Sequence, residues 1–126
     1  MALTQEIRVA LVGSSEHFGH LARLCLKMES GFVVVGDATD GPGAIAMATR
    51  VQPDIILLDL DMPAMCGLAS IPAIRACSPR SRIAVLSSFP DPFTLSDTLS
   101  WGADTYLDRT TSLWGLTTIC RSLLSE

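Results

Sequence analysis

The sequence of 126 residues has few charged side chains, few aromatic ones and no long hydrophobic run. Charged residues make up 17% and aromatic residues 6%, whereas 48% are hydrophobic, so the composition excludes a disordered chain and favours one globular domain. The longest apolar stretches, FVVV and IILL, fall far short of the roughly 18 residues of a membrane span. Nothing basic precedes an apolar block at Met1, so a leader peptide is not indicated. We expect a single soluble, cytoplasmic domain over residues 1–126.

Basic residues are in the minority, because 9 Lys and Arg stand against 13 Asp and Glu and the net charge is −4. This balance offers no electrostatic footprint for nucleic acid, so contact with DNA would need another module. The cysteines form no Cys-x-x-Cys pair and no Cys/His cluster with metal-site spacing. We interpret them as reduced thiols: Cys25, Cys66, Cys77 and Cys120.

Hydrophobic runs alternate with amphipathic stretches along the whole chain, which is typical of a parallel sheet covered on both faces. The predicted strands are short and mostly aliphatic: Ile7 to Val12, Phe32 to Gly36, Asp54 to Leu60, Arg82 to Ser87 and Thr105 to Leu107. With right-handed crossovers, the commonest arrangement is a doubly wound five-stranded sheet of order 2-1-3-4-5, the flavodoxin-like (βα)5 fold.

Five helices are predicted between and after these strands. The first begins after a cap at Ser14 or Ser15 and ends at Gly31, and the last has its cap at Thr111 or Ser112 and its apolar stripe from Leu113 to Leu124. The three between them are Ala44 to Val51, Leu68 to Cys77 with an irregular start at Pro72, and Pro92 to Trp101.

Ligands of such a fold bind beyond the carboxyl ends of the strands. This rule selects the following residues: Gly13, Ser14, Ser15, Asp59, Ser87, Ser88, Asp108 and Arg109. Asp59 interrupts the apolar run IILLDLDMP, where a buried carboxylate is costly unless it is paired or used. The structural alternative is a carboxylate held by Arg109 or by hydroxyl groups.

These residues resemble the receiver domain of two-component response regulators, most closely the NarL/LuxR-type subclass. The resemblance runs from about Ile7 to Leu124 and is strongest in PDIILLDLDMPAMCGL, VLSSFPDP and WGADTYLDRTTS. It implies that Asp59 accepts a phosphoryl group from a histidine kinase and that Ser87 and Tyr106 form the switch. It also implies a homodimer through the face of the fourth helix, fifth strand and fifth helix, and a downstream helix-turn-helix that binds DNA.

Three positions depart from the family pattern. The family places two acidic Mg²⁺ ligands after the first strand, where this chain has Gly13 and Ser14, and it has a lysine where this chain has Arg109. Magnesium needs hard oxygen ligands, so we expect no metal, or weak Mg²⁺ binding through Asp59 and Asp61. The resemblance, with these departures, predicts an atypical receiver that is phosphorylated slowly or not at all.

Two other functions stay open. One is an orthodox phosphoacceptor, because Arg109 preserves the lysine charge and Glu16 or Asp61 could rebuild a metal site. The other is a small-molecule domain in which Gly13, Ser14 and Ser15 seat an anion at a helix N-terminus, although serines there also act simply as caps. An enzyme is not expected, since the sequence has no nucleophile and base pair and no nucleotide fingerprint.

The remaining reactive or aromatic residues have simpler explanations. His17 and His20 lie one helical turn apart without a third ligand, so we interpret them as solvated or packing side chains. Cys66 has no cationic neighbour in sequence and is interpreted as an inert thiol. If they are exposed, Trp101 and Trp114 mark the predicted dimer face.

Overall fold

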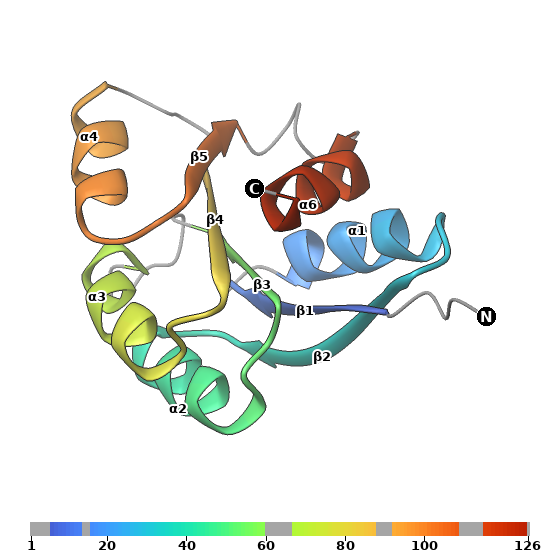
Figure 1. The fold of residues 1–126 in the computed structure, drawn as a ribbon, viewed down its shortest axis with the longest axis horizontal. Coiled ribbons are helices and arrows are strands. Elements are labelled where there is room, and N and C mark those ends of the chain that lie inside the picture. The colour runs from blue at the N-terminus through green and yellow to red at the C-terminus, as the bar shows by residue number, and fades with distance from the viewer. Residues whose placement is uncertain (1–5, 14–15, 60–66, 88–91, 109–114, 126) are drawn as a thin grey trace.

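The computed structural model describes residues 6–13, 16–59, 67–87, 92–108 and 115–125, which form a layered α/β domain (Figure 1). They contain one parallel sheet in the order β2-β1-β3-β4-β5. Its strands are β1 (Ile7–Val12), β2 (Phe32–Ala38), β3 (Ile55–Asp59), β4 (Arg82–Ser87) and β5 (Thr105–Asp108). The predicted doubly wound fold of order 2-1-3-4-5 is confirmed.

The helices lie on both faces of this sheet. One face is covered by α1 (Glu16–Lys27) and α6 (Leu116–Leu124), and the other by α2 (Gly41–Val51) and α3 (Gly67–Cys77) (Figure 1). The remaining helix, α4 (Pro92–Ser100), lies beside β5 at the sheet edge. None of the described helices is long and apolar enough to cross a membrane.

Alternation along the central strands builds two hydrophobic cores. In β1, Val9 and Leu11 pack toward α1 and α6, whereas Ala10 and Val12 pack toward α2 and α3. The aliphatic residues of β3 are fully buried on both sides, and each such side chain stabilises the fold by about 1.5–3 kcal/mol. The rigid sheet therefore holds the carboxyl ends of its strands in a fixed arrangement.

The second helix begins earlier than the predicted Ala44. It starts at Gly41 because the Asp40 side chain caps it, with Oδ1 accepting the Gly43 N–H at 2.7 Å, and Pro42 occupies the first turn. Its end agrees with the prediction, since Gln52 adopts a left-handed conformation, with φ 50°, directly before Pro53.

The predicted end of the first helix and the predicted start of the last helix also differ from the structure or lie outside it. The first helix ends at Lys27, and Gly31, with φ 100°, lies in the turn before β2 instead of terminating the helix. The last helix begins at Leu116 with Gly115 as its N-cap, and the predicted cap at Thr111 or Ser112 lies outside the described residues. The other changes lengthen or shorten an element by one or two residues.

Candidate functional site

Strand register aligns four residues at the carboxyl edge of the sheet. Val12 lies beside Leu58, so Gly13 comes level with Asp59 one residue further on. Asp59 in turn lies beside Leu86, which Ser87 follows, and Ser87 lies beside Asp108. Because neighbouring strands are about 4.8 Å apart, the four positions form one continuous row.

Asp59 is almost completely buried at the end of β3, with 1% of its surface exposed. Its alternation with Ile55 and Leu57 places it on the face that α1 and α6 cover. A carboxylate in this environment is costly to ionise unless charges or hydrogen-bond donors compensate it. The sequence singled out Asp59 as an acidic residue at the end of an apolar strand, and the structure places it there in a buried position.

Ser87 and Tyr106 lie on the opposite face of the sheet from Asp59. Ser87 is 6% exposed, and it alternates with Val85, which lies beside Tyr106 on β5. The Tyr106 ring packs against the core beneath α2 and α3, and its hydroxyl is buried without a hydrogen-bond partner among the described residues. The structure thus brings Ser87 and Tyr106 together on adjacent strands.

Thr98 of α4 is a buried polar residue that sequence reasoning missed. Its exposed fraction is 0%, and its hydroxyl, like that of Tyr106, finds no partner within the described part of the chain. An unpartnered buried hydroxyl costs roughly 1–3 kcal/mol. No local pattern in the sequence signals this burial, because it depends on how α4 packs in the folded domain.

Gly13 adds no side-chain ligand to this row. Its backbone N–H donates to the Ala38 carbonyl at 2.9 Å, which continues the pairing of β1 with β2 by one residue. That N–H is therefore occupied, and an anion bound at this turn would depend on Ser14 and Ser15. Several predicted site residues lie outside the described residues: Ser14, Ser15, Asp61, Ser88 and Arg109. The side chain of Glu16 lies outside them too.

The donor set determines whether this edge suits a divalent cation. Mg²⁺ takes an octahedron of oxygen ligands and usually relies on at least one or two carboxylates. Among the described residues no group of three His, Cys, Asp or Glu side chains could hold a metal ion, and Gly13 stands level with Asp59 where a carboxylate would be needed. The described residues therefore supply the Asp59 carboxylate but no acidic side chain beside it at the end of β1.

The structure describes some of the cysteines, histidines and tryptophans that the sequence analysis placed outside the candidate site. Cys25, Cys77 and Cys120 are free thiols, and His20 is exposed. Trp101 is 41% exposed next to α4. Trp114, Cys66 and the His17 side chain lie outside the described residues.

Comparison with known proteins identifies this arrangement. The family model for the response regulator receiver domain matches residues 9–120. The chain belongs to the response regulator receiver domain family. The receiver domain of NarL from Mycobacterium tuberculosis is a similar solved structure, with 26% identity and a TM-score of 0.82 over 94% of this chain and 98% of that one.

The curated relatives narrow the subclass. The nitrate/nitrite response regulator NarL of Escherichia coli is 39% identical over 82 residues, which are 65% of this chain and 38% of the relative. The response regulator VraR of Staphylococcus aureus is 36% identical over 87 residues, covering 69% of this chain and 42% of VraR. The chain is thus a receiver domain of the NarL/LuxR type, as its sequence indicated, and it spans less than half the length of these relatives.

Proposed function

We propose that this receiver is atypical and controls its output with weak or no Mg²⁺-dependent phosphorylation of Asp59. The observation that supports the proposal is the register of β1 and β3, which sets Gly13, and not an acidic residue, level with Asp59. Phosphoryl transfer depends on cations that neutralise the charge on the equatorial oxygens. Without bound Mg²⁺, most of this task falls to Arg109.

In this proposal, Asp59, Ser87, Tyr106 and Arg109 have distinct roles. Asp59 is the carboxylate whose charge state or modification is sensed, and Arg109 is the cation that pairs with it through a planar guanidinium. Ser87 and Tyr106, adjacent through the pairing of β4 with β5, transmit the change to α4. The hydroxyls of Tyr106 and Thr98 have no hydrogen-bond partner among the described residues, which favours a second arrangement of this region in which they are hydrated.

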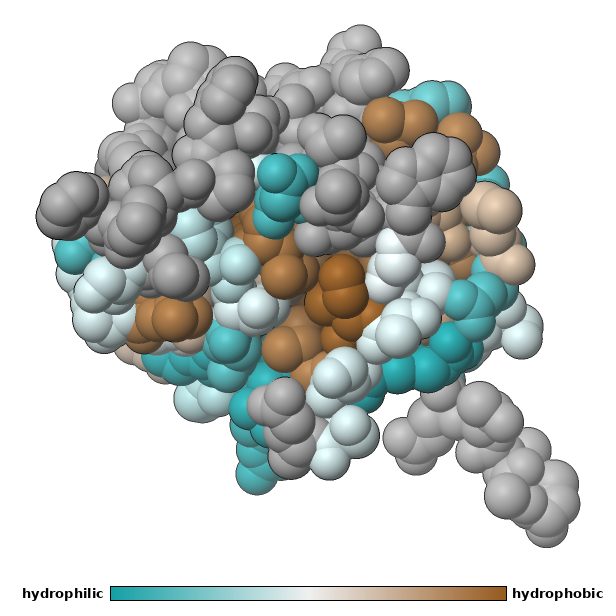
Figure 2. Space-filling view, turned by 90° about the horizontal axis from the view of Figure 1, so that it is seen from above, coloured by the Kyte–Doolittle hydropathy of each residue, from teal (hydrophilic) through white to brown (hydrophobic). Residues whose placement is uncertain are grey.

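The output of such a domain is proposed to be contact with a second copy through α4, β5 and α6. Figure 2 views the end of the molecule that carries these elements, and hydrophobic residues gather near its centre. Leu99, Trp101 and Leu124 are exposed on or next to these helices, and Leu107 and Ile119 are only partly buried. A histidine kinase upstream and a DNA-binding module in the same protein complete the proposed pathway.

An orthodox phosphoacceptor is the second candidate, and one observation favours it. Asp59 and Ser87 are buried at adjacent strand ends, with 1% and 6% exposed, which is a protected setting for a reactive carboxylate. The two candidates differ in how the site binds magnesium.

A magnesium titration separates them. Trp101 is an intrinsic fluorophore beside α4, and the double variant Gly13→Asp/Ser14→Asp restores the acidic pair that the family pattern contains. We expect the double variant to bind Mg²⁺ at millimolar concentration and the unmodified chain to show no saturable response. Saturable binding by the unmodified chain, abolished in Asp59→Asn, would favour the orthodox candidate instead.

A further inference from the structure

A groove lies on the side of the sheet away from β5, between α1 and the outer edge of β2. Its cavity has a volume of about 320 Å³ and is lined by Arg23, Leu26, Lys27, Phe32, Val33 and Val34. Leu26 is 2% exposed, and Phe32 and Val34 pack against the same core, so the floor of the groove is apolar. The groove is remote from Asp59 and is independent of the function proposed above.

The wall of this groove is an open sheet edge. In the described part of the chain, β2 pairs with β1 alone. The Gly31 carbonyl accepts the Ile7 N–H at 2.7 Å, and successive residues of a parallel strand turn their backbone groups to alternate edges. Phe32 and Val34 therefore direct their N–H and C=O groups outward, away from β1.

The open edge is short. Val9 lies beside Val34 and Ala10 beside Gly36, so Val35 is an extra residue that interrupts the register. A bulge of this kind twists a strand and limits pairing with another chain. The regular stretch is thus confined to Phe32 to Val34, the same residues that line the cavity.

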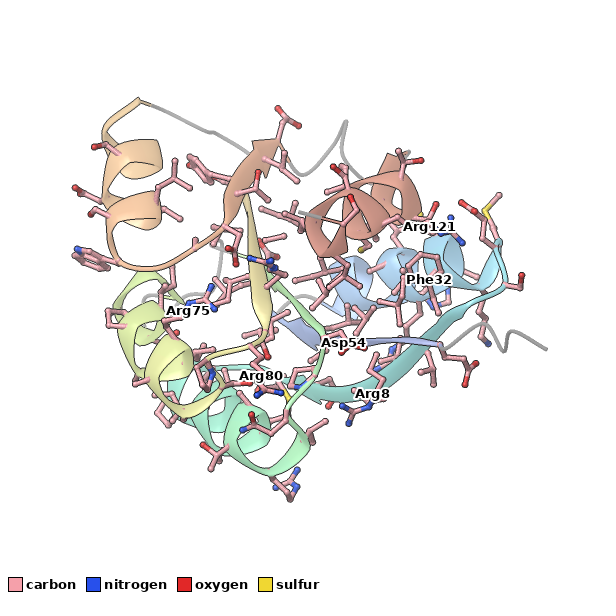
Figure 3. All side chains as sticks on the ribbon, in the orientation of Figure 1. Arg8, Phe32, Asp54, Arg75, Arg80 and Arg121 are labelled. Carbon is pink, nitrogen blue, oxygen red and sulfur yellow. The ribbon has the colours of Figure 1, made fainter. Side chains whose placement is uncertain are left out.

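Two cationic side chains, Arg23 and Lys27, line the groove. Lys27 is exposed and has no ion-pair or hydrogen-bond partner among the described residues. Arg23 pairs with Asp37 at 2.6 Å, but both side chains are solvent-accessible, at 43% and 67%, and such pairs are weak and exchangeable. The other nearby acid, Glu29, is already held by Arg121, whose guanidinium lies 4.8 Å from the Phe32 ring centre (Figure 3).

We propose that this groove binds an extended acidic peptide segment of a partner protein. The segment adds to the β2 edge through the outward backbone groups of Phe32 and Val34, which is a recurrent mode of peptide recognition. One carboxylate of the peptide pairs with Lys27, and a second replaces Asp37 as the partner of Arg23. An apolar side chain of the peptide enters the cavity over Leu26. A second copy of this chain is a less favourable occupant of the groove. Antiparallel pairing of two β2 edges about Val33 would bring the two Lys27 side chains together, and their like charges would repel.

Lys27 provides a direct probe, since it is the one lysine in the sequence. Reductive ¹³C-methylation labels its amine together with the α-amino group, and the two differ in chemical shift. The labelled protein is titrated with acetyl-Glu-Val-Glu-Val-Glu-amide and with a peptide in which lysine replaces each glutamate. We expect saturable shifts of the Lys27 signal and of the Phe32 and Val34 amides with the acidic peptide alone.

Charge reversal tests the specificity of this site. Lys27→Glu, followed through backbone amides, should weaken binding of the acidic peptide at least about fivefold. Arg50→Glu reverses the charge of another exposed side chain, in the last turn of α2, and should leave binding unchanged. Equal binding of both peptides, equal effects of the two variants, or shifts confined to other strands would overturn the proposal. Dimerisation of the unliganded protein through protected β2 amides, measured by sedimentation and hydrogen exchange, would overturn it as well.

Discussion

The Arg75 guanidinium donates two hydrogen bonds to the Gly102 carbonyl oxygen, from Nε at 3.0 Å and from Nη2 at 2.7 Å. Nη2 also pairs with Asp104 at 2.7 Å, and Nη1 reaches the Ser81 carbonyl. Arg75 thereby ties the end of α3 to the turn between α4 and β5, where Gly102 holds a left-handed φ of 123°. This contact anchors the amino end of β5, at the opposite end of that strand from the candidate site.

Removing the guanidinium should destabilise the domain. In Arg75→Met the Gly102 and Ser81 carbonyls lose their donors and Asp104 loses an ion-pair partner, so we expect unfolding to require about 2 kcal/mol less free energy. Urea denaturation followed by tryptophan fluorescence measures this change. Arg80→Met is the matched control, because Arg80 is exposed and has no partner among the described residues, and its stability should not change. Equal stability of the Arg75 variant and the control would contradict this role.

Glu29 should make stability depend on acid pH. Hydrogen bonds from Thr117 and then Arg121 hold the pKa of the Glu29 carboxyl below its ordinary value of 4.5. The folded state therefore binds the proton less readily than the unfolded state, so this contribution is present above about pH 4.5 and is lost as pH falls through the lowered pKa. Between pH 6 and pH 3, Glu29→Gln should lose less stability than the unmodified chain in thermal unfolding scans. Parallel curves for the two proteins would refute the coupling.

Cys120 should resist alkylation in the native state. Burial raises the pKa of the Cys120 thiol from 9.0 to about 12, and the side chain has 0% exposure in the core beneath α1 and α6. Since the thiolate is the reactive form, iodoacetamide at pH 8.5 should modify Cys120 only after denaturation in urea. Peptide mapping by mass spectrometry reports each cysteine separately. Labelling of Cys120 as fast in native protein as in urea would show that the α6 packing is wrong.

The order of strands could be predicted from the sequence because it depends on hydrophobic runs that are local and strong. IILLD is buried on both faces and reads as a central parallel strand without any tertiary information. Helix starts were harder to predict, since a cap depends on one hydrogen bond. With Asp40 as its N-cap, α2 begins at Gly41, three residues before the predicted start. The sequence shows a polar residue at this position but does not reveal which backbone N–H its side chain will accept.

The candidate site was predictable in part. A carboxylate such as Asp59 at the end of an apolar strand is visible in sequence, and strand order then brings it level with Gly13. Burial of Thr98 and the contacts of Arg75 depend on how α3 and α4 pack, which no local pattern specifies. The groove beside β2 was not predicted because it requires the register of β1 and β2 to identify the outward backbone groups.

We propose that Asp59 lacks the metal ligands for efficient phosphorylation. The most direct test is intact-mass analysis after incubation with acetyl phosphate, with and without Mg²⁺, for the unmodified chain, Asp59→Asn and Gly13→Asp/Ser14→Asp. We expect no adduct or a trace on the unmodified chain under either condition, and a Mg²⁺-dependent phosphoryl adduct on the double variant. A stoichiometric adduct on the unmodified chain that requires both Mg²⁺ and Asp59 would contradict it.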